Sequence, residues 1–230
     1  MKTIGLIGGM SWESSIEYYR IINEEVRNRL GKLHSARSLM YSVDFADVEL
    51  LQREGRWDEA TASMIDAAKR LERGGADFVV ICTNTMHRMA DEVQHSIGIP
   101  VLHVCDAAAD AVKKHAIRSV GLLGTRFTME EDFYRGRLER RHGLQVHVPD
   151  AADREQVHRV IYDELVAGEL RRESKTAFLR IIDGLVSRGA QGIILGCTEI
   201  PLLIKEEDCP VPVFDTTRLH ALAAVDLALA

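Results

Sequence analysis

The chain has 230 residues, 46% of them hydrophobic and 28% charged, and its 29 basic and 35 acidic residues give a net charge of −6 (29 − 35 = −6). This composition is typical of a soluble globular protein, and the length fits one large domain or two small ones. The acidic balance argues against binding of nucleic acid through its phosphates. No apolar run approaches the ~20 residues that a membrane helix needs. We therefore expect no nucleic-acid partner and no membrane partner.

The N-terminal segment lacks the small-residue cleavage site that is typical of a signal peptide. The cysteines, Cys82, Cys105, Cys197 and Cys209, form no Cys-x-x-Cys pair and do not resemble the disulfide framework of a small secreted domain. The histidines are scattered without the spacing of metal ligands. These features predict a cytoplasmic protein with reduced thiols and no metal site.

Short aliphatic or β-branched runs alternate with longer amphipathic stretches, in the order typical of a parallel α/β sheet. The predicted strands are Thr3–Ile7, Ser38–Ser42, Phe78–Ile81, Val101–Val104, Ser119–Leu123, Leu144–Val148, Gly192–Leu195 and Pro212–Phe214. Ser14-x-x-Glu17 and Thr128-x-x-Glu131 resemble capping boxes, in which a side-chain oxygen and a carboxylate satisfy free amides at a helix start. The sequence therefore predicts that two helices begin at these two sites.

Two segments of the first half recur in the second half. Residues 2–8 are echoed by residues 118–124 (124 − 8 = 116), and residues 73–85 are echoed by residues 187–199, with Gly75 matching Gly189 (189 − 75 = 114). Because the order and spacing of the echoes agree, we interpret them as an internal duplication. The predicted fold class is α/β, with two pseudo-symmetric lobes, each a mostly parallel sheet flanked by helices. Residues 1–100 plus 215–230 form the predicted first lobe, and residues 101–214 form the second.

The residues best suited to chemistry follow the predicted strands, where ligands of open α/β sheets bind. The first strand of each half leads into Gly8-Gly9-Met10-Ser11 or Gly124-Thr125-Arg126, and the third leads into Thr83-Asn84-Thr85 or Cys197-Thr198-Glu199. None of these loops matches a dinucleotide or nucleoside-triphosphate motif. We therefore expect a small anionic ligand, bound in a cleft between the lobes.

The duplication sets Thr83, rather than Cys82, at the position equivalent to Cys197. Successive side chains of a strand point to opposite faces, so Cys82 is predicted to be buried in the core. Cys197 follows a strand end and precedes a helix start, whose positive dipole would favour a thiolate. The predicted site is therefore asymmetric, with a thiol in one half and a hydroxyl in the other.

Three loop sequences in combination resemble the aspartate/glutamate racemase family: Gly-Gly-Met-Ser at 8–11, Asn-Thr-x-His at 84–87 and Gly-Cys-Thr-Glu at 196–199. The resemblance extends over essentially the whole chain. It implies an isomerase that racemises a small-molecule amino acid without pyridoxal phosphate or any other cofactor, and it implies a homodimer. The family usually carries two cysteines, and Thr83 stands where the first one is expected. This departure resembles a single-cysteine branch specific for L-aspartate and L-glutamate.

The resemblance implies a role for each candidate residue. Cys197 would remove the α-proton of an acidic amino acid, with the L-form preferred, and Thr83 would return a proton on the opposite face, directly or through water. The implied substrate-binding residues are Met10, Ser11, Gln52, Thr83, Asn84, Thr85, Thr198 and Glu199. Gln52 has an alternative interpretation as part of a solvated turn, and Met10 as a core residue.

Two other functions fit the same residues. A cofactor-independent decarboxylase or isomerase would use the single Cys197 to protonate an enolate, and release of carbon dioxide would identify the decarboxylase. A non-catalytic protein that binds an acidic amino acid would leave Cys197 without a role in turnover. The combination of motifs favours racemisation over both.

Overall fold

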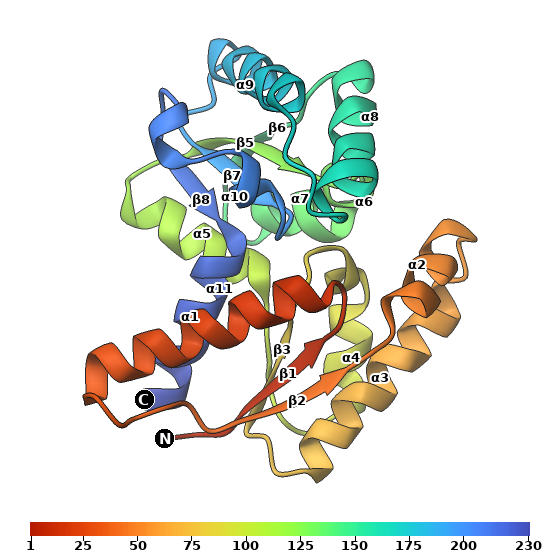
Figure 1. Cartoon of the computed structure of the whole chain (residues 1–230), viewed down its shortest axis with the longest axis vertical. Coiled ribbons are helices and arrows are strands. Elements are labelled where there is room, and N and C mark those ends of the chain that lie inside the picture. Colours follow the sequence, from red (N-terminus) through yellow and green to blue (C-terminus); the bar gives the residue numbers. More distant parts are fainter. The chain divides into compact units, whose positions relative to one another are not determined.

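The computed structural model describes all 230 residues, and the chain divides into two α/β units (Figure 1). Unit 1 comprises Met1–Val104 and His220–Ala230, and unit 2 comprises Cys105–Leu219. Each unit contains one four-stranded sheet in which all neighbouring strands are parallel. The chain changes unit at 104/105 and 219/220, whereas the predicted boundaries were 100/101 and 214/215.

The elements of unit 1 alternate between strands and helices along the chain. They are β1 (Ile4–Gly8), α1 (Trp12–Leu30), β2 (Ser38–Ser42), α2 (Phe45–Arg53), α3 (Trp57–Arg73), β3 (Phe78–Ile81), the 3₁₀ helix η1 (Thr85–Met89), α4 (Ala90–Ser96) and β4 (Val101–Leu102). The C-terminal helix α11 (Thr216–Leu229) begins in unit 2, and its residues from His220 onward belong to unit 1.

Unit 2 repeats the alternation with more helical segments. Its elements are α5 (Val104–Lys114), β5 (Ser119–Gly124), α6 (Arg126–Glu130), α7 (Asp132–Arg140), β6 (Gln145–His147), α8 (Ala151–Val160), the π-helical turn η2 (Ile161–Leu165), α9 (Arg172–Ser187), β7 (Ile193–Gly196), α10 (Ile200–Leu203), the 3₁₀ helix η3 (Glu206–Asp208) and β8 (Val213–Asp215). All the predicted strands are present within a residue or two of their bounds. The largest difference is at Val104, which begins α5 instead of ending a strand.

The two sheets share one topology, with strand order β2-β1-β3-β4 in unit 1 and β6-β5-β7-β8 in unit 2. In each, the first strand of the unit pairs with the second and the third, and the third pairs with the fourth. The predicted α/β class with parallel sheets is confirmed, and the matching strand orders support the internal duplication.

Helices cover both faces of the unit 1 sheet (Figure 1). One core cluster joins alternate residues of β1 and β3, including Ile4 and Phe78, to buried residues of α1 and α11. The other joins the intervening residues, including Ile7 and Ile81, to α3, η1 and α4. The strict alternation of side chains along β1 and β3 produces these two cores, and Cys82 continues the α1/α11 side.

The helix starts differ from the predicted ones by one helical turn. Ser11 is the N-cap of α1 and Thr125 is the N-cap of α6, and each side-chain oxygen accepts a hydrogen bond from the backbone N–H three residues later, on Ser14 or Thr128. The predicted caps were therefore wrong, because Ser14 and Thr128 lie inside the first turn. The observed caps are themselves related by the duplication (125 − 11 = 114).

The strand register provides an independent alignment of the two halves. Gly5 pairs with Val79 in unit 1, and Gly121 pairs with Ile193 in unit 2. Since Gly5 and Gly121 are equivalent in the sequence repeat, Val79 is equivalent to Ile193 (193 − 79 = 114). Continuing along β3 and β7, this register makes Thr83 the structural counterpart of Cys197.

Candidate active site

The turn after β1 is held in shape by hydroxyl groups of α1. Ser15 Oγ donates a hydrogen bond to the carbonyl oxygen of Ser11 at 2.9 Å and accepts one from the N–H of Gly9 at 2.8 Å. Gly9 has φ +92°, and a Cβ there would lie 2.1 Å from the carbonyl oxygen of Val43, so no larger residue fits. The turn therefore places Ser11 at the N-terminus of a long helix, where anions are favoured.

The loop after β3 curls back onto the strand end. The N–H of Thr83 donates to the carbonyl oxygen of Ile81 at 2.9 Å, and the carbonyl oxygen of Thr83 lies 2.7 Å from Nδ1 of His87. Asn84 and Thr85 are buried, whereas Thr83 is half-buried. Unit 1 thus brings three of the predicted site residues into one tight turn.

Met10 and Gln52 are both buried in unit 1. Gln52 lies on α2, and its Nε2 donates a hydrogen bond to Sδ of Met86 at 3.1 Å. Met10 packs in the same core cluster as Met86. The interpretation of Gln52 as part of a solvated turn is therefore wrong, because the residue lies on the inner face of a helix.

In unit 2, Cys197 and Thr198 both donate hydrogen bonds to one carboxylate oxygen. Cys197 Sγ lies 2.9 Å from Oε2 of Glu199, and Thr198 Oγ1 lies 2.6 Å from the same atom. Cys197 and Glu199 are only 7% and 8% exposed. The carboxylate is therefore placed to receive the thiol proton as an adjacent general base.

The surroundings of Cys197 raise its pKa well above the ordinary value of a thiol. Burial is the largest cause, followed by the negative charge of Glu199 and the hydrogen bond to its carboxylate. Hydrogen bonds from the backbone N–H groups of Glu199 and Ile200 oppose this rise without cancelling it. The helix start thus favours a thiolate, as expected, but burial and Glu199 outweigh it, and the thiol holds its proton at neutral pH.

The other cysteines occupy different environments. Cys82 is fully buried in the core beside α1, and Cys105 is fully buried in unit 2; burial raises the pKa of both thiols. Cys209 is half-buried, and desolvation raises its pKa to about 11. Cys197 has a carboxylate as a hydrogen-bond partner, whereas Cys82 and Cys105 contact the carbonyl oxygens of Val80 and Tyr134.

The equivalent loops of the two units differ in how they are held. The register that pairs Thr83 with Cys197 also pairs Thr85 with Glu199 and His87 with Pro201. In unit 1 an imidazole contacts the backbone of the loop, and in unit 2 a carboxylate contacts its reactive side chain. The duplicated scaffold therefore carries two chemically distinct loops.

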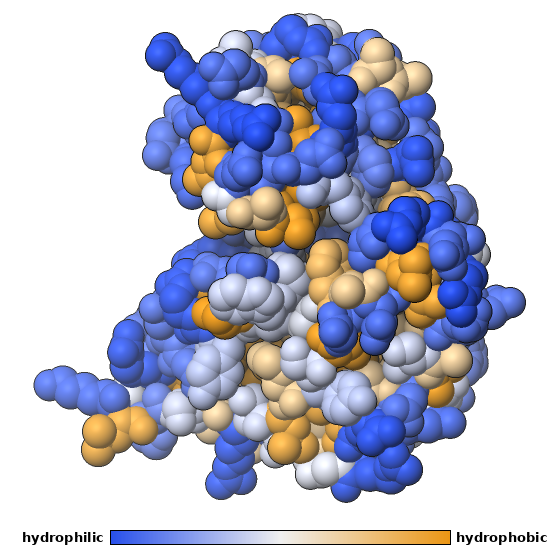
Figure 2. Space-filling view, turned by 45° about the vertical axis from the view of Figure 1, so that its right-hand side comes forward, coloured by the Kyte–Doolittle hydropathy of each residue, from blue (hydrophilic) through white to orange (hydrophobic).

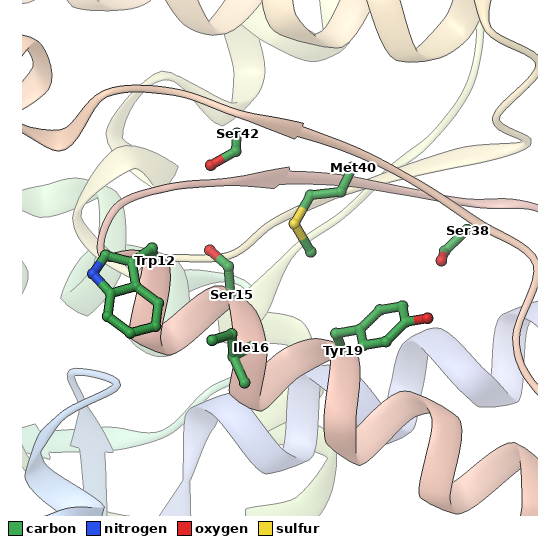
Figure 3. Close-up of a pocket in the computed structure, with 7 residues that line it drawn as sticks. All are labelled: Trp12, Ser15, Ile16, Tyr19, Ser38, Met40 and Ser42. Atoms are coloured by element: carbon green, nitrogen blue, oxygen red, sulfur yellow. The ribbon is translucent and has the colours of Figure 1, made fainter.

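A separate pocket of about 460 Å³ lies on unit 1 between α1 and the edge strand β2 (Figure 3). Its lining residues are Trp12, Ser15, Ile16, Tyr19, Ser38, Met40 and Ser42. Ser15 connects this pocket to the turn at Ser11 through the hydrogen bonds described above. None of the predicted site residues lines it.

The surface seen in Figure 2 is largely hydrophilic, with apolar residues in scattered groups. No helix is long and apolar enough to cross a membrane. No group of three histidine, cysteine or acidic side chains is arranged to hold a metal ion. The homodimer and the cytoplasmic location stay predictions.

Sequence reasoning missed the contact of Ser15 with the turn at Ser11, although Ser15 stands four residues after Ser11. For His87, four residues after Thr83, the spacing indicates a residue that orients the loop or begins a helix, and the structure shows the contact with the loop. Residues with this spacing face each other across one helical turn, so the spacing was a usable signal. The partner of Cys197 was among the predicted residues, but its effect on the thiol pKa depends on burial.

Comparison with known proteins places the chain in a family. The model of the family described as Asp/Glu/Hydantoin racemase matches residues 7–224. A crystal structure of a candidate Asp/Glu racemase from Yersinia pestis is 53% identical, with TM-score 0.95 and complete coverage of both chains. That of an aspartate racemase homologue from Pyrococcus horikoshii is 38% identical, with TM-score 0.87 and complete coverage of both chains.

Among curated proteins, the broad-specificity amino-acid racemase RacX of Bacillus subtilis is 25% identical over 99% of this chain and 98% of its own length. The match with the family model runs from the end of β1 through most of α11, and therefore includes all the loops described above. The chain belongs to the Asp/Glu/hydantoin racemase family, and it is an amino-acid racemase, an enzyme of the isomerase class.

Proposed function

We propose that the protein racemises an acidic amino acid, aspartate or glutamate, without a cofactor and with the L-form as the preferred substrate. Cys197 removes the α-proton, and Thr83 returns a proton to the opposite face of the same α-carbon. The observation that carries the proposal is the strand register, which pairs one thiol with one hydroxyl at equivalent positions of a duplicated scaffold.

The first step uses the thiol–carboxylate pair. The proton of Cys197 passes to Oε2 of Glu199, which lies 2.9 Å from Sγ, and the resulting thiolate takes the α-proton of the substrate. The Cα–H bond breaks, an S–H bond forms, and the electron pair stays on the α-carbon as a carbanion conjugated with the carboxylate. Glu199 thus supplies the base that a protonated, buried thiol requires.

Cys197 and Thr83 cannot exchange their roles in the two steps, because a thiol and a hydroxyl differ in acidity. A thiol has a reference pKa near 8.5, whereas an aliphatic hydroxyl ionises far above this range. Thr83 can therefore donate or relay a proton to the carbanion, but it removes a proton poorly. As the new Cα–H bond forms, the O–H bond of Thr83 breaks; the hydroxyl then regains a proton from water, and Glu199 releases to water the proton that it took from Cys197. This inequality supports a preference for the enantiomer whose α-hydrogen faces Cys197.

The negative charge that develops on the substrate carboxylate needs hydrogen-bond donors. The proposed donors are the hydroxyls of Ser11 and Thr85, the side-chain amide of Asn84, and the backbone N–H of Thr198, whose hydroxyl donates to Glu199. Ser11 lies at the N-terminus of α1, where the helix dipole favours an anion. The substrate class is supported by the names of the similar proteins, which include an aspartate racemase homologue and Asp/Glu racemases.

The test is chiral chromatography of L- and D-aspartate and L- and D-glutamate incubated with the purified protein, with and without pyridoxal phosphate. We expect inversion without the cofactor, and loss of inversion in Cys197→Ala but not in the matched thiol control Cys209→Ser. Dependence on pyridoxal phosphate, release of carbon dioxide, or binding without inversion would each contradict the proposal.

A further inference from the structure

His87 is a buried side chain to which the proposed reaction gives no role. It lies on η1 and is 2% exposed. Its Nδ1 lies 2.7 Å from the carbonyl oxygen of Thr83, and its Nε2 accepts a hydrogen bond from the N–H of Val104 at 3.2 Å. The imidazole thus connects the loop that carries Thr83 to the first residue of α5.

These two partners determine the tautomer of the ring. A carbonyl oxygen only accepts hydrogen bonds, so Nδ1 of His87 carries the hydrogen that is donated to Thr83. A backbone N–H only donates, so Nε2 must keep its lone pair for Val104. His87 is therefore a neutral imidazole, and protonation at Nε2 would break the bond to Val104.

A second histidine fixes the surroundings of the first. His220 Nε2 donates to the carbonyl oxygen of Leu102 at 2.9 Å, and its Nδ1 lies 2.9 Å from the hydroxyl of Tyr18. The rings of His103 and His220 lie 4.7 and 5.6 Å from that of His87, measured between centroids. The imidazole of His87 thus packs against two rings, one of which is bound to the backbone of unit 1.

We propose that His87 is a positioning residue for the proton donor on the Thr83 side. By holding the carbonyl oxygen of Thr83, it sets where the Thr83 hydroxyl stands beyond β3, and so how often the carbanion is protonated from that side. The equivalent position in unit 2 is Pro201, which has no such side chain, so this hydrogen bond acts only on the Thr83 side of the substrate. This inference rests on the proposed function.

Loss of the hydrogen bond between His87 and Thr83 should change how often the carbanion is reprotonated from Thr83 relative to Cys197. In heavy water, return of a deuteron from Cys197 labels the starting enantiomer, whereas delivery from Thr83 produces the labelled opposite enantiomer. A misplaced Thr83 lowers the second outcome relative to the first. A general loss of folding or binding lowers both together and leaves their ratio unchanged.

Two variants separate the two hydrogen bonds of the ring. In His87→Asn the side-chain amide reaches the position of Nδ1 and still donates to Thr83, whereas in His87→Gln it reaches the position of Nε2 and satisfies only Val104. We expect His87→Gln to lower the ratio of inversion to exchange about fivefold, the effect of one lost hydrogen bond, and His87→Asn to stay within about twofold of the wild type.

A second measurement needs no variant. Nitrogen-15 NMR of histidine-labelled wild-type protein should show His87 as the neutral tautomer with its hydrogen on Nδ1. The opposite tautomer, a charged ring, or a wild-type partition ratio in folded His87→Gln would overturn the inference. Cys197→Ala separates this from the proposed function: if it still exchanges the α-hydrogen, the proposed function fails, whatever the His87 variants do.

Discussion

Glu199 has two opposing effects on the thiol of Cys197, its hydrogen-bond partner. The carboxylate raises the pKa of the thiol, which keeps the proton on sulfur at rest. The same carboxylate accepts that proton when the thiolate is needed. Removing its charge should therefore make Cys197 more acidic and, at the same time, less useful in catalysis.

Glu199→Gln tests this pair directly. We expect the pKa of Cys197 to fall, so that iodoacetamide alkylates it faster at pH 8, by roughly tenfold for each unit of the fall. Racemisation should slow by about 10², the usual loss when a general base is removed. Mass spectrometry gives the alkylation rate, with Cys209 in the same sample as the internal control. Slower alkylation together with unchanged racemisation would show that Glu199 has neither role.

At the scale of elements, the turn between β1 and α1 depends on Ser15, which also lines the pocket beside β2 (Figure 3). Ser15→Ala removes the acceptor of the Gly9 N–H and one of the hydroxyl donors to the carbonyl oxygen of Ser11. Because Ser11 is a proposed ligand of the substrate carboxylate, we expect KM to rise about tenfold, from the loss of about 1–2 kcal/mol.

Ser38→Ala is the matched control for that prediction, since Ser38 lines the same pocket from β2. Its KM should stay within about twofold of the wild type, because Ser38 is half-buried in the pocket and contributes nothing to the turn at Ser11. Steady-state kinetics on both variants provide the comparison. An equal rise in KM for the two variants would place the effect in the pocket and not in the turn.

The elements also show which features a sequence pattern predicts well. The strands are predictable because each is a short apolar run bounded by polar or glycine residues. The sequence repeat and the strand register also agree that Thr83 is the counterpart of Cys197. The helix starts were misplaced because Ser11 and Ser14 are both good caps, and the choice between them depends on the preceding turn. The burial of Gln52 and the contact of His87 with Val104 follow from tertiary packing, which no local pattern contains.

For the whole molecule, the fully buried thiols make the free energy of unfolding fall as the pH rises into the alkaline range. Burial raises the pKa of Cys82 in the folded state, so the neutral thiol stabilises the fold below the unfolded value near 8.5. Above that value the unfolded chain loses this proton and the folded chain keeps it, so the free energy of unfolding falls by about 1.4 kcal/mol per pH unit for this group.

Comparison of wild type with Cys82→Ala isolates this effect from other alkaline titrations. We expect the stability difference between the two proteins to shrink by about 2 kcal/mol between pH 8 and pH 10. Urea unfolding at the two pH values measures it. A difference that stays constant would mean that Cys82 ionises equally in the folded and unfolded states.

The central claim is that one thiol and one hydroxyl at equivalent positions make the reaction directional. Its most direct measurement is the rate of α-hydrogen exchange in heavy water, started separately from L- and D-aspartate, in the wild type and in Thr83→Cys. We predict faster exchange from L-aspartate in the wild type, and rates that approach each other when a second thiol replaces the hydroxyl. Equal rates from the two enantiomers in the wild type, or an unchanged ratio in Thr83→Cys, would contradict the account.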